Sequence, residues 1–196
     1  MDFELSDEQK DVQKAAREFA QGEFDPDLAL ELDQKGKFPE SIWKKASQLG
    51  FIGIHYPEEF GGQGLGIFEN LLVIEAFCRV DSGIGSALSS VDLGSEVILK
   101  FGSHEQKNQF LTPLTKGEKQ LGIALGESED GRDLTDISTI AERKVDEYYS
   151  IHGKKSFVLN VSLADSFVTL CKEPKEGWMT LIIEREKDGI EIHSIE

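Results

Sequence analysis

Cysteine is scarce in this sequence, with two residues among 196, Cys78 and Cys171. Both have apolar neighbours, so the sequence predicts reduced thiols in a core rather than a disulfide framework. The four histidines lie far apart along the chain, and no cysteine or histidine spacing is typical of a metal site. Structural zinc and disulfide-stabilised folds are therefore not expected.

Long hydrophobic runs are also missing. No apolar stretch approaches the roughly 20 residues that a helix needs to cross a bilayer. The first ten residues, MDFELSDEQK, are acidic and amphipathic, unlike a signal peptide. We therefore expect a cytoplasmic protein without membrane insertion.

Positive charge is in short supply. Lysine and arginine number 21 against 37 aspartates and glutamates, which gives a net charge of −16. This balance argues against nucleic acid as a partner, and an anionic ligand would require a local basic patch or helix N-termini. The hydrophobic content of 39% is ordinary for a globular protein.

The first part of the chain has helical patterns. Ser6 with Gln9, and Ser103 with Gln106, have the spacing of capping boxes. Apolar residues recur at helical spacing after each helix start, and glycine or proline marks the stops. The predicted helices run from Ser6 to near Gly22, over 39–50, 67–80 and 85–101, and from Ser103 to Pro113, which closes the last.

Beyond residue 120 the pattern changes to short β-like runs between polar turns. The runs are 121–125, 137–142, 148–151, 155–159, 166–171, 179–184 and 190–194. The fold class predicted is α+β, with an all-helical domain over 1–119 and a partial, mostly antiparallel β domain over 120–196. Another segment or chain could supply missing strands, or the sheet could be small and self-sufficient.

Several stretches, in order and over essentially the whole chain, together resemble the acyl-CoA dehydrogenases. The matching stretches are 3–9, 38–45, 49–54, 57–65, 74–75, 79–80, 101–107 and 111–114. The glycines at 62, 64 and 66 form no dinucleotide-binding fingerprint, because no strand precedes them and the spacing differs. We interpret them as a turn whose glycines allow positive φ.

The resemblance implies FAD as cofactor, held by two segments of the β domain. The family's Thr-Glu-Pro-x-x-Gly-Ser-Asp pattern corresponds to 126–133, which follows Leu125. Glu127, Gly131 and Asp133 fit that pattern. Gly126 replaces the threonine whose hydroxyl binds the flavin ring, and its backbone N–H is the donor that remains. Arg132 replaces the serine; it could pair with phosphate or be a solvated surface charge.

The second flavin segment of the family, Lys-x-Trp-Ile-Thr-Asn, corresponds to 155–160. Phe157 stands at the tryptophan position, where the resemblance implies contact with the isoalloxazine ring. From the residues alone, a core aromatic of the sheet is an equal interpretation. Leu159 replaces the threonine and loses a polar contact.

The resemblance places Ser95 and Glu96 in the helix that lines the acyl pocket. A glutamate beside an alkyl chain is costly unless it is paired or neutral, which would suggest a polar acyl group or none. The alternative is that Glu96 faces solvent or pairs with Lys100 at i+4.

The family's catalytic carboxylate belongs to a second helical domain with no counterpart in this sequence, so no catalytic residue is assigned. The expected function is that of the N-terminal part or a split subunit of an FAD-dependent acyl-CoA dehydrogenase. Its expected partners are an acyl-CoA, a C-terminal-half chain, an electron-transfer flavoprotein and other subunits of a homo- or hetero-oligomer. The alternatives are a non-catalytic binding or scaffold protein and a related flavin monooxygenase.

Overall fold

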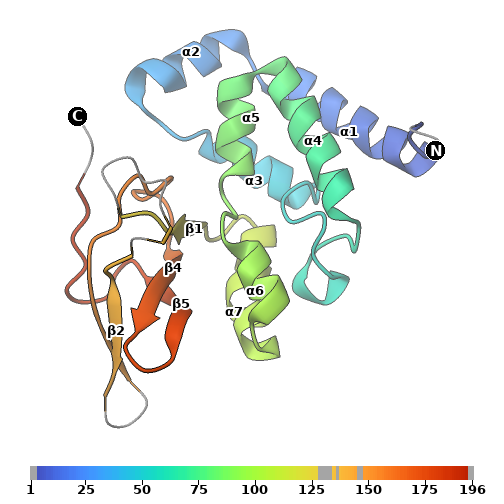
Figure 1. The fold of residues 1–196 in the computed structure, drawn as a ribbon. Helices are drawn as coiled ribbons and strands as arrows, with labels where there is room; N and C mark the ends of the chain where they lie inside the picture. Colours follow the sequence, from blue (N-terminus) through green and yellow to red (C-terminus); the bar gives the residue numbers. More distant parts are fainter. Residues whose placement is uncertain (1–3, 128–133, 136, 145–147, 194–196) are drawn as a thin grey trace. The chain divides into compact units, whose positions relative to one another are not determined.

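The computed structural model describes residues 4–127, 134–135, 137–144 and 148–193. The chain divides into two compact units, residues 1–119 and 120–196 (Figure 1). The first is helical and the second holds a sheet, so each unit has its own core.

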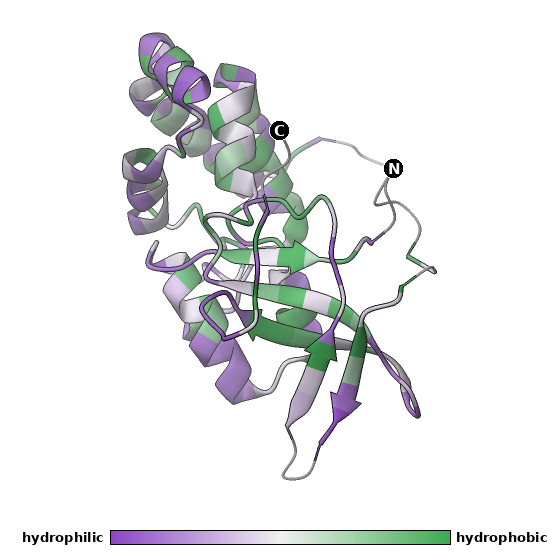
Figure 2. Ribbon diagram, turned by 90° about the vertical axis from the view of Figure 1, so that its left-hand side faces the viewer, coloured by the Kyte–Doolittle hydropathy of each residue, from purple (hydrophilic) through white to green (hydrophobic). Residues whose placement is uncertain are grey.

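The described part of the helical unit contains seven α-helices and one 3-10 turn. Hydrophilic and hydrophobic residues alternate along the helices, as expected where one face is buried (Figure 2). The helices are α1 (Asp7–Glu23), α2 (Pro26–Lys35), α3 (Glu40–Gln48), α4 (Ile67–Val80), α5 (Ser82–Ser89), α6 (Ser95–Phe101) and α7 (His104–Thr115), with the 3-10 turn η1 at Glu58–Phe60.

Both predicted capping boxes are present. The Ser6 hydroxyl accepts from the Gln9 backbone N–H, and the Gln9 side chain accepts from the Ser6 N–H. Ser103 and Gln106 repeat this exchange at the start of α7. Helix α4 spans the predicted residues. These helix starts are set locally, so the sequence alone defines them.

Helix α2 was not predicted. It begins after Asp25, whose carboxylate accepts from the Leu28 N–H, and ends at Gly36 in the left-handed conformation. None of its residues is fully buried. The helix therefore has no pronounced apolar face, and its capping residues are the sequence signal that could have predicted it.

The single helix predicted over 85–101 is wrong, because the chain forms α5 and α6 with a break between them. The Ser90 hydroxyl donates to the Ala87 carbonyl at the end of α5. Gly94 then adopts a φ of 92°, which no α-helix contains. Serine side chains compete for helical carbonyls, and the glycine allows the turn.

Pro113 does not close α7 but lies inside it, two residues before the helix ends at Thr115. Proline removes one backbone donor. So close to the C-terminus that loss disturbs little of the helix, and the Pro113 carbonyl still accepts from the Glu118 N–H.

Aromatic rings occupy the centre of the helical unit. Phe19, Phe24, Phe51 and Phe77 pack with ring centroids 5.3 to 6.1 Å apart, in edge-to-face and tilted arrangements. They come from α1, α4 and the connections after α1 and α3. The core thus joins segments that are distant in sequence.

The glycine turn after η1 contains two kinds of glycine. Of the three glycines interpreted as allowing positive φ, Gly64 alone has one, at 66°, and the nearby Gly61 has a φ of 85°. Gly66 precedes α4 with a φ of −89°. Gly62 has no positive φ, yet a Cβ there would overlap the carbonyl of Tyr56. Close backbone approach, not left-handed conformation, therefore requires glycine at position 62.

We expect Gly62→Ala to destabilise the chain by about 3 kcal/mol, because backbone atoms of Tyr56 must move to admit the methyl group. Gly64→Ala is the matched control, with only the Glu58 side chain near its Cβ and a cost of about 1 kcal/mol from the left-handed φ. Urea denaturation of both variants compares these values. A smaller loss for Gly62→Ala than for Gly64→Ala would contradict the close-approach explanation.

The second unit contains a mixed sheet of five strands in the described residues. They are β1 (Leu121–Ala124), β2 (Ile140–Arg143), β3 (Tyr149–His152), β4 (Ser166–Glu173) and β5 (Gly177–Glu184). The central β4 pairs parallel with β1 and, at one position, with β2, and antiparallel with β5 along its whole length. Since β2 and β3 are also antiparallel, most paired residues are antiparallel.

The predicted α+β class, with a mostly antiparallel sheet, is confirmed. Two predicted strands are wrong. Residues 155–159 form no strand, because Phe157 has a φ of 55° and cannot be extended. Residues 190–193 form none either, and their side chains are mostly exposed. Apolar residues in short runs therefore misled the prediction at both places.

Among the residues that the structure describes, none of the helices has the length and apolar character to cross a membrane.

Candidate functional site

Two segments of the second unit meet beyond the end of β1. The first, 125–127, follows β1 directly, and the second, 155–160, lies within the connection between β3 and β4. The Ser156 N–H donates to the Gly126 carbonyl at 2.9 Å, and the Ser156 hydroxyl to the Glu127 carbonyl at 3.4 Å. The structure thus brings together the two segments that the sequence analysis associated with flavin.

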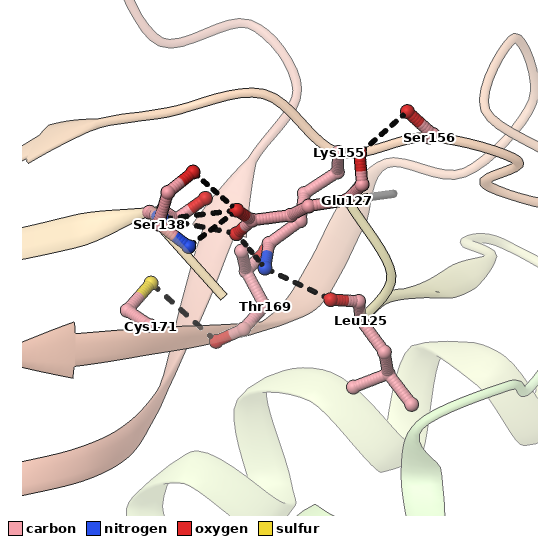
Figure 3. Close-up of polar contacts among 8 residues, drawn as sticks. Leu125, Glu127, Ser138, Lys155, Ser156, Thr169 and Cys171 are labelled. Carbon is pink, nitrogen blue, oxygen red and sulfur yellow. Dashed lines mark hydrogen bonds and ion pairs between the residues drawn. The ribbon is translucent and has the colours of Figure 1, made fainter. Parts of the chain in front are cut away.

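A buried ion pair joins the same segments. The Lys155 ammonium donates to Glu127 Oε1 at 2.6 Å and to the Leu125 carbonyl at 2.9 Å (Figure 3). Only 10% of the Lys155 side chain and 6% of the Glu127 side chain are exposed. Buried charges need partners, and here each charge is the partner of the other.

Two residues that precede β2 complete the coordination of Glu127. The Ser138 N–H and hydroxyl both donate to Glu127 Oε2 at 2.6 Å, and the Thr139 N–H donates to Oε1 at 3.0 Å. We refer to Glu127 and Lys155 with these donors as the Glu127–Lys155 cluster. It links β1, the approach to β2 and the connection before β4.

The charge of Glu127 is stabilised despite its burial. Burial acts to raise the pKa of this carboxyl, but the hydrogen bonds from Lys155, Ser138 and Thr139 outweigh burial and lower the pKa to about 2. Glu127 is therefore ionised at neutral pH. The cluster therefore contains a buried carboxylate rather than a neutral carboxyl group.

Phe157 lies just beyond the cluster with its ring exposed. The residue is 54% exposed, and its φ of 55° is strained for an aromatic residue. Val158 packs instead against the small core of Ala124, Ala164 and Phe167. The core residue of this segment is therefore Val158, and Phe157 is not part of that core.

The end of this segment is also fixed. Asn160 has a φ of 54°, and its carbonyl accepts from the N–H groups of Leu163 and Ala164. Leu159, between Phe157 and Asn160, is 64% exposed. Strained backbone at an exposed aromatic, supported on both sides, is typical of a functional site.

The two candidate substrate residues lie in the helical unit. Ser95 is buried at the start of α6. Glu96 is exposed, and its Oε1 lies 2.6 Å from Nε2 of His55, whose side chain is only 6% exposed. The carboxylate is paired with this histidine rather than with Lys100.

Sequence reasoning missed a second polar pair beside these residues. The fully buried Tyr56 donates from its hydroxyl to Asp92 at 2.8 Å. Burial raises the pKa of the Tyr56 hydroxyl and also that of the Asp92 carboxyl. Asp92 borders a small cavity that is otherwise lined mainly by apolar side chains of α4, α5 and the 51–53 segment. No spacing in the sequence relates Tyr56 to Asp92.

Two further candidates, Gly131 and Arg132, lie outside the described residues. Of the other flavin candidates, Gly126 is buried, Leu125 is half-buried, and Phe157 and Leu159 are exposed. The sequence matched both Glu127 and Lys155 to the family pattern, but gave no sign that they bond to each other.

Comparison with known proteins covers both units. The family model described as the acyl-CoA dehydrogenase N-terminal domain matches residues 6–118, and the one described as the middle domain matches residues 122–196. Each of the two units thus corresponds to one domain of a known enzyme family.

Individual relatives agree with the family models. The short-chain-specific acyl-CoA dehydrogenase of Clostridium acetobutylicum is 35% identical over 100% of this chain and 52% of its own length. A 3-(aryl)acrylate reductase of Clostridium sporogenes is 34% identical over 91% of this chain and 48% of its own. The structure of an acyl-CoA dehydrogenase complexed with FAD from Bacillus anthracis matches 98% of this chain and 34% of its own, with a TM-score of 0.85 and 30% identity.

The chain spans about half the length of the curated relatives it matches. Within that span, the helical unit and the sheet unit each correspond to one of the two family models. The chain therefore belongs to the acyl-CoA dehydrogenase family.

Proposed function

We propose that the chain supplies the flavin-binding sheet unit and the helical unit of an FAD-dependent acyl-CoA oxidoreductase. The reaction is the α,β-dehydrogenation of an acyl-CoA thioester. When bound, FAD supplies the hydride acceptor for this chemistry. Because the chain spans about half the length of its curated relatives, its proposed role is that of the N-terminal part or a split subunit of the enzyme.

One observation carries this proposal: the Glu127–Lys155 cluster joins the two flavin segments and leaves the Phe157 ring exposed beside them. A residue that is 54% exposed and has a strained backbone contributes little to the core. Its exposed face suits a planar aromatic ligand. Contact with the isoalloxazine ring would explain why an aromatic residue occupies this strained, exposed position.

The residues present fit FAD in part. An aromatic face and backbone groups are available beside the cluster. Gly126 and Leu159 provide no side-chain hydroxyl, so polar contacts to the flavin ring fall to the backbone. We expect weaker FAD binding than in a relative with threonine at these positions.

The partners follow from the same family membership. We infer an acyl-CoA as substrate, with Ser95 and Glu96 near its acyl group, and a C-terminal-half chain as the source of the base. An electron-transfer flavoprotein and a homo- or hetero-oligomeric assembly are further proposals. The named relatives include a reductase, so the direction of the reaction is a separate question for the assay.

Phe157→Gly tests the proposed flavin contact. We expect FAD affinity to fall by about 1 kcal/mol, or about fivefold in Kd, because a stacking face is lost. The free energy of unfolding should not fall, since glycine relieves the strained φ. FAD titration followed by flavin fluorescence, together with urea denaturation, gives both values for the chain mixed with the C-terminal part of a relative.

Tyr148→Gly is the matched control, because Tyr148 is an aromatic residue that is 73% exposed outside the two segments. It should leave FAD affinity unchanged. Equal FAD affinity of Phe157→Gly and the parent chain would refute contact between Phe157 and flavin. No FAD binding by the parent chain under any of these conditions would refute the proposed function.

A second candidate is a non-catalytic binding or scaffold protein of the same fold. The exposed Leu159 and the missing hydroxyl at Gly126 favour it, because both reduce the polar contacts available to flavin. A stable, colourless chain that binds neither FAD nor acyl-CoA would support this candidate.

A further inference from the structure

The direction of one peptide group depends on Lys155. The Leu125 carbonyl accepts from the Lys155 ammonium at 2.9 Å and therefore points into the Glu127–Lys155 cluster (Figure 3). In a trans peptide the C=O and N–H bonds point in opposite directions. The N–H of Gly126, which belongs to the same peptide group, is therefore directed away from the cluster.

Gly126 has little conformational preference of its own. Without a Cβ it samples more backbone conformations than any other residue. Hydrogen bonds hold the backbone on both sides of it: Lys155 at the Leu125 carbonyl, and Ser156 at the carbonyls of Gly126 and Glu127. Hydrogen bonds from the 155–156 segment therefore restrain the backbone dihedral angles that glycine alone would leave free.

Lys155 is in turn held in place by Glu127. The carboxylate fixes the ammonium at 2.6 Å, and the Ser138 and Thr139 donors fix the carboxylate. Both side chains of the pair are at least nine-tenths buried. A shift of the ammonium would break a buried charge pair, so its position at the Leu125 carbonyl is tightly defined.

We propose that Lys155 is a positioning residue for FAD, which orients the Gly126 N–H as a donor to the flavin ring, with Glu127 holding Lys155. This inference rests on the proposed function. The proposed role matters because position 126 is a glycine and offers no threonine hydroxyl. The backbone N–H of Gly126 is then the donor that remains. The direction of this N–H decides whether it reaches the flavin.

The test compares Lys155→Met and Lys155→Arg with the parent chain by FAD titration and by the absorption spectrum of the bound flavin. We expect Lys155→Met to raise the Kd for FAD at least tenfold and to shift the flavin spectrum towards that of free FAD. Lys155→Arg keeps a buried cation but places different donors at Leu125. It should raise the Kd at least threefold with a smaller spectral shift, and it decides the question if Lys155→Met does not fold.

Val168→Ala is the control for a purely structural effect. Val168 is buried in β4 and outside the cluster, so this variant should lower stability while the spectrum of bound flavin stays unchanged. Lys155 variants with parental FAD affinity and spectrum would overturn the positioning role alone. A parent chain that binds no FAD would overturn the role together with the proposed function.

Discussion

Lys155→Met is expected to lower the free energy of unfolding by about 3 to 5 kcal/mol, the scale for removing one partner of a buried ion pair. The substitution leaves the Glu127 carboxylate only 6% exposed and without its cation. The donors from Ser138 and Thr139 remain, but they carry no full charge. Urea denaturation at neutral pH measures the loss.

Two further variants make this expectation specific. Lys154→Met changes the neighbouring exposed lysine and should stay within about 0.5 kcal/mol of the parent chain. The double variant Glu127→Gln with Lys155→Met removes both charges and should recover part of the loss, because no unpaired buried charge remains. A single Lys155→Met variant as stable as Lys154→Met would contradict the buried pair.

The free energy of unfolding should also depend on pH, because Glu127 titrates differently in the folded and unfolded chain. Its folded-state pKa of about 2 lies below the ordinary value of 4.5. The stabilisation is therefore fully present above pH 4.5 and is lost as the pH falls towards 2. From these two values we expect a contribution of about 3 kcal/mol.

Comparison of the parent chain with Glu127→Gln separates this effect from the other carboxylates. The amide side chain is neutral at every pH, so the parent should be more stable than the variant at pH 7. The difference should shrink steadily between pH 4.5 and pH 2. Urea denaturation across this range measures it, and a difference that is independent of pH would show that Glu127 has no lowered pKa.

The local features of the fold could be predicted from the sequence because neighbouring residues determine them. Ser6 with Gln9 defines the start of α1, and Ser103 with Gln106 that of α7. The strand signals located each of the five strands found in the described residues, since their apolar runs end at polar turns. Such features require only residues that are close along the chain.

Features that depend on distant residues could not be predicted. Tyr56 and Asp92 are 36 residues apart, and their hydrogen bond depends on how α4, α5 and α6 pack. Glu127 and Lys155 are 28 residues apart and meet only when the sheet has formed. The sequence therefore predicts neither hydrogen bond, although the positions of Glu127 and Lys155 match the family pattern.

The failed strand over 155–159 shows why local pattern was insufficient at the site itself. Apolar residues at 157–159 favour a strand by composition. Lys155 turns inward to Glu127 and the Leu125 carbonyl, and Phe157 takes a left-handed conformation. Sequence rules fail most often where function imposes strain, and here the failure falls on a proposed flavin contact.

The two proposed flavin positions that lack a threonine differ in their surroundings. Leu159 is exposed, so its lost hydroxyl could only have contacted solvent or a ligand. Gly126 lies between two carbonyls held by the 155–156 segment. The hydrogen bonds from Lys155 and Ser156 therefore restrain the backbone around Gly126, whereas the Leu159 side chain stays exposed.

Hydrogen–deuterium exchange with and without FAD, on the chain mixed with the C-terminal part of a relative, tests the central claim most directly. That claim is that 125–127 and 155–160 together hold the flavin. The account predicts that FAD slows exchange in both segments, and that Lys155→Arg weakens this protection at the FAD concentration used for the parent chain. Slowed exchange confined to other parts of the chain, with FAD bound, would contradict it.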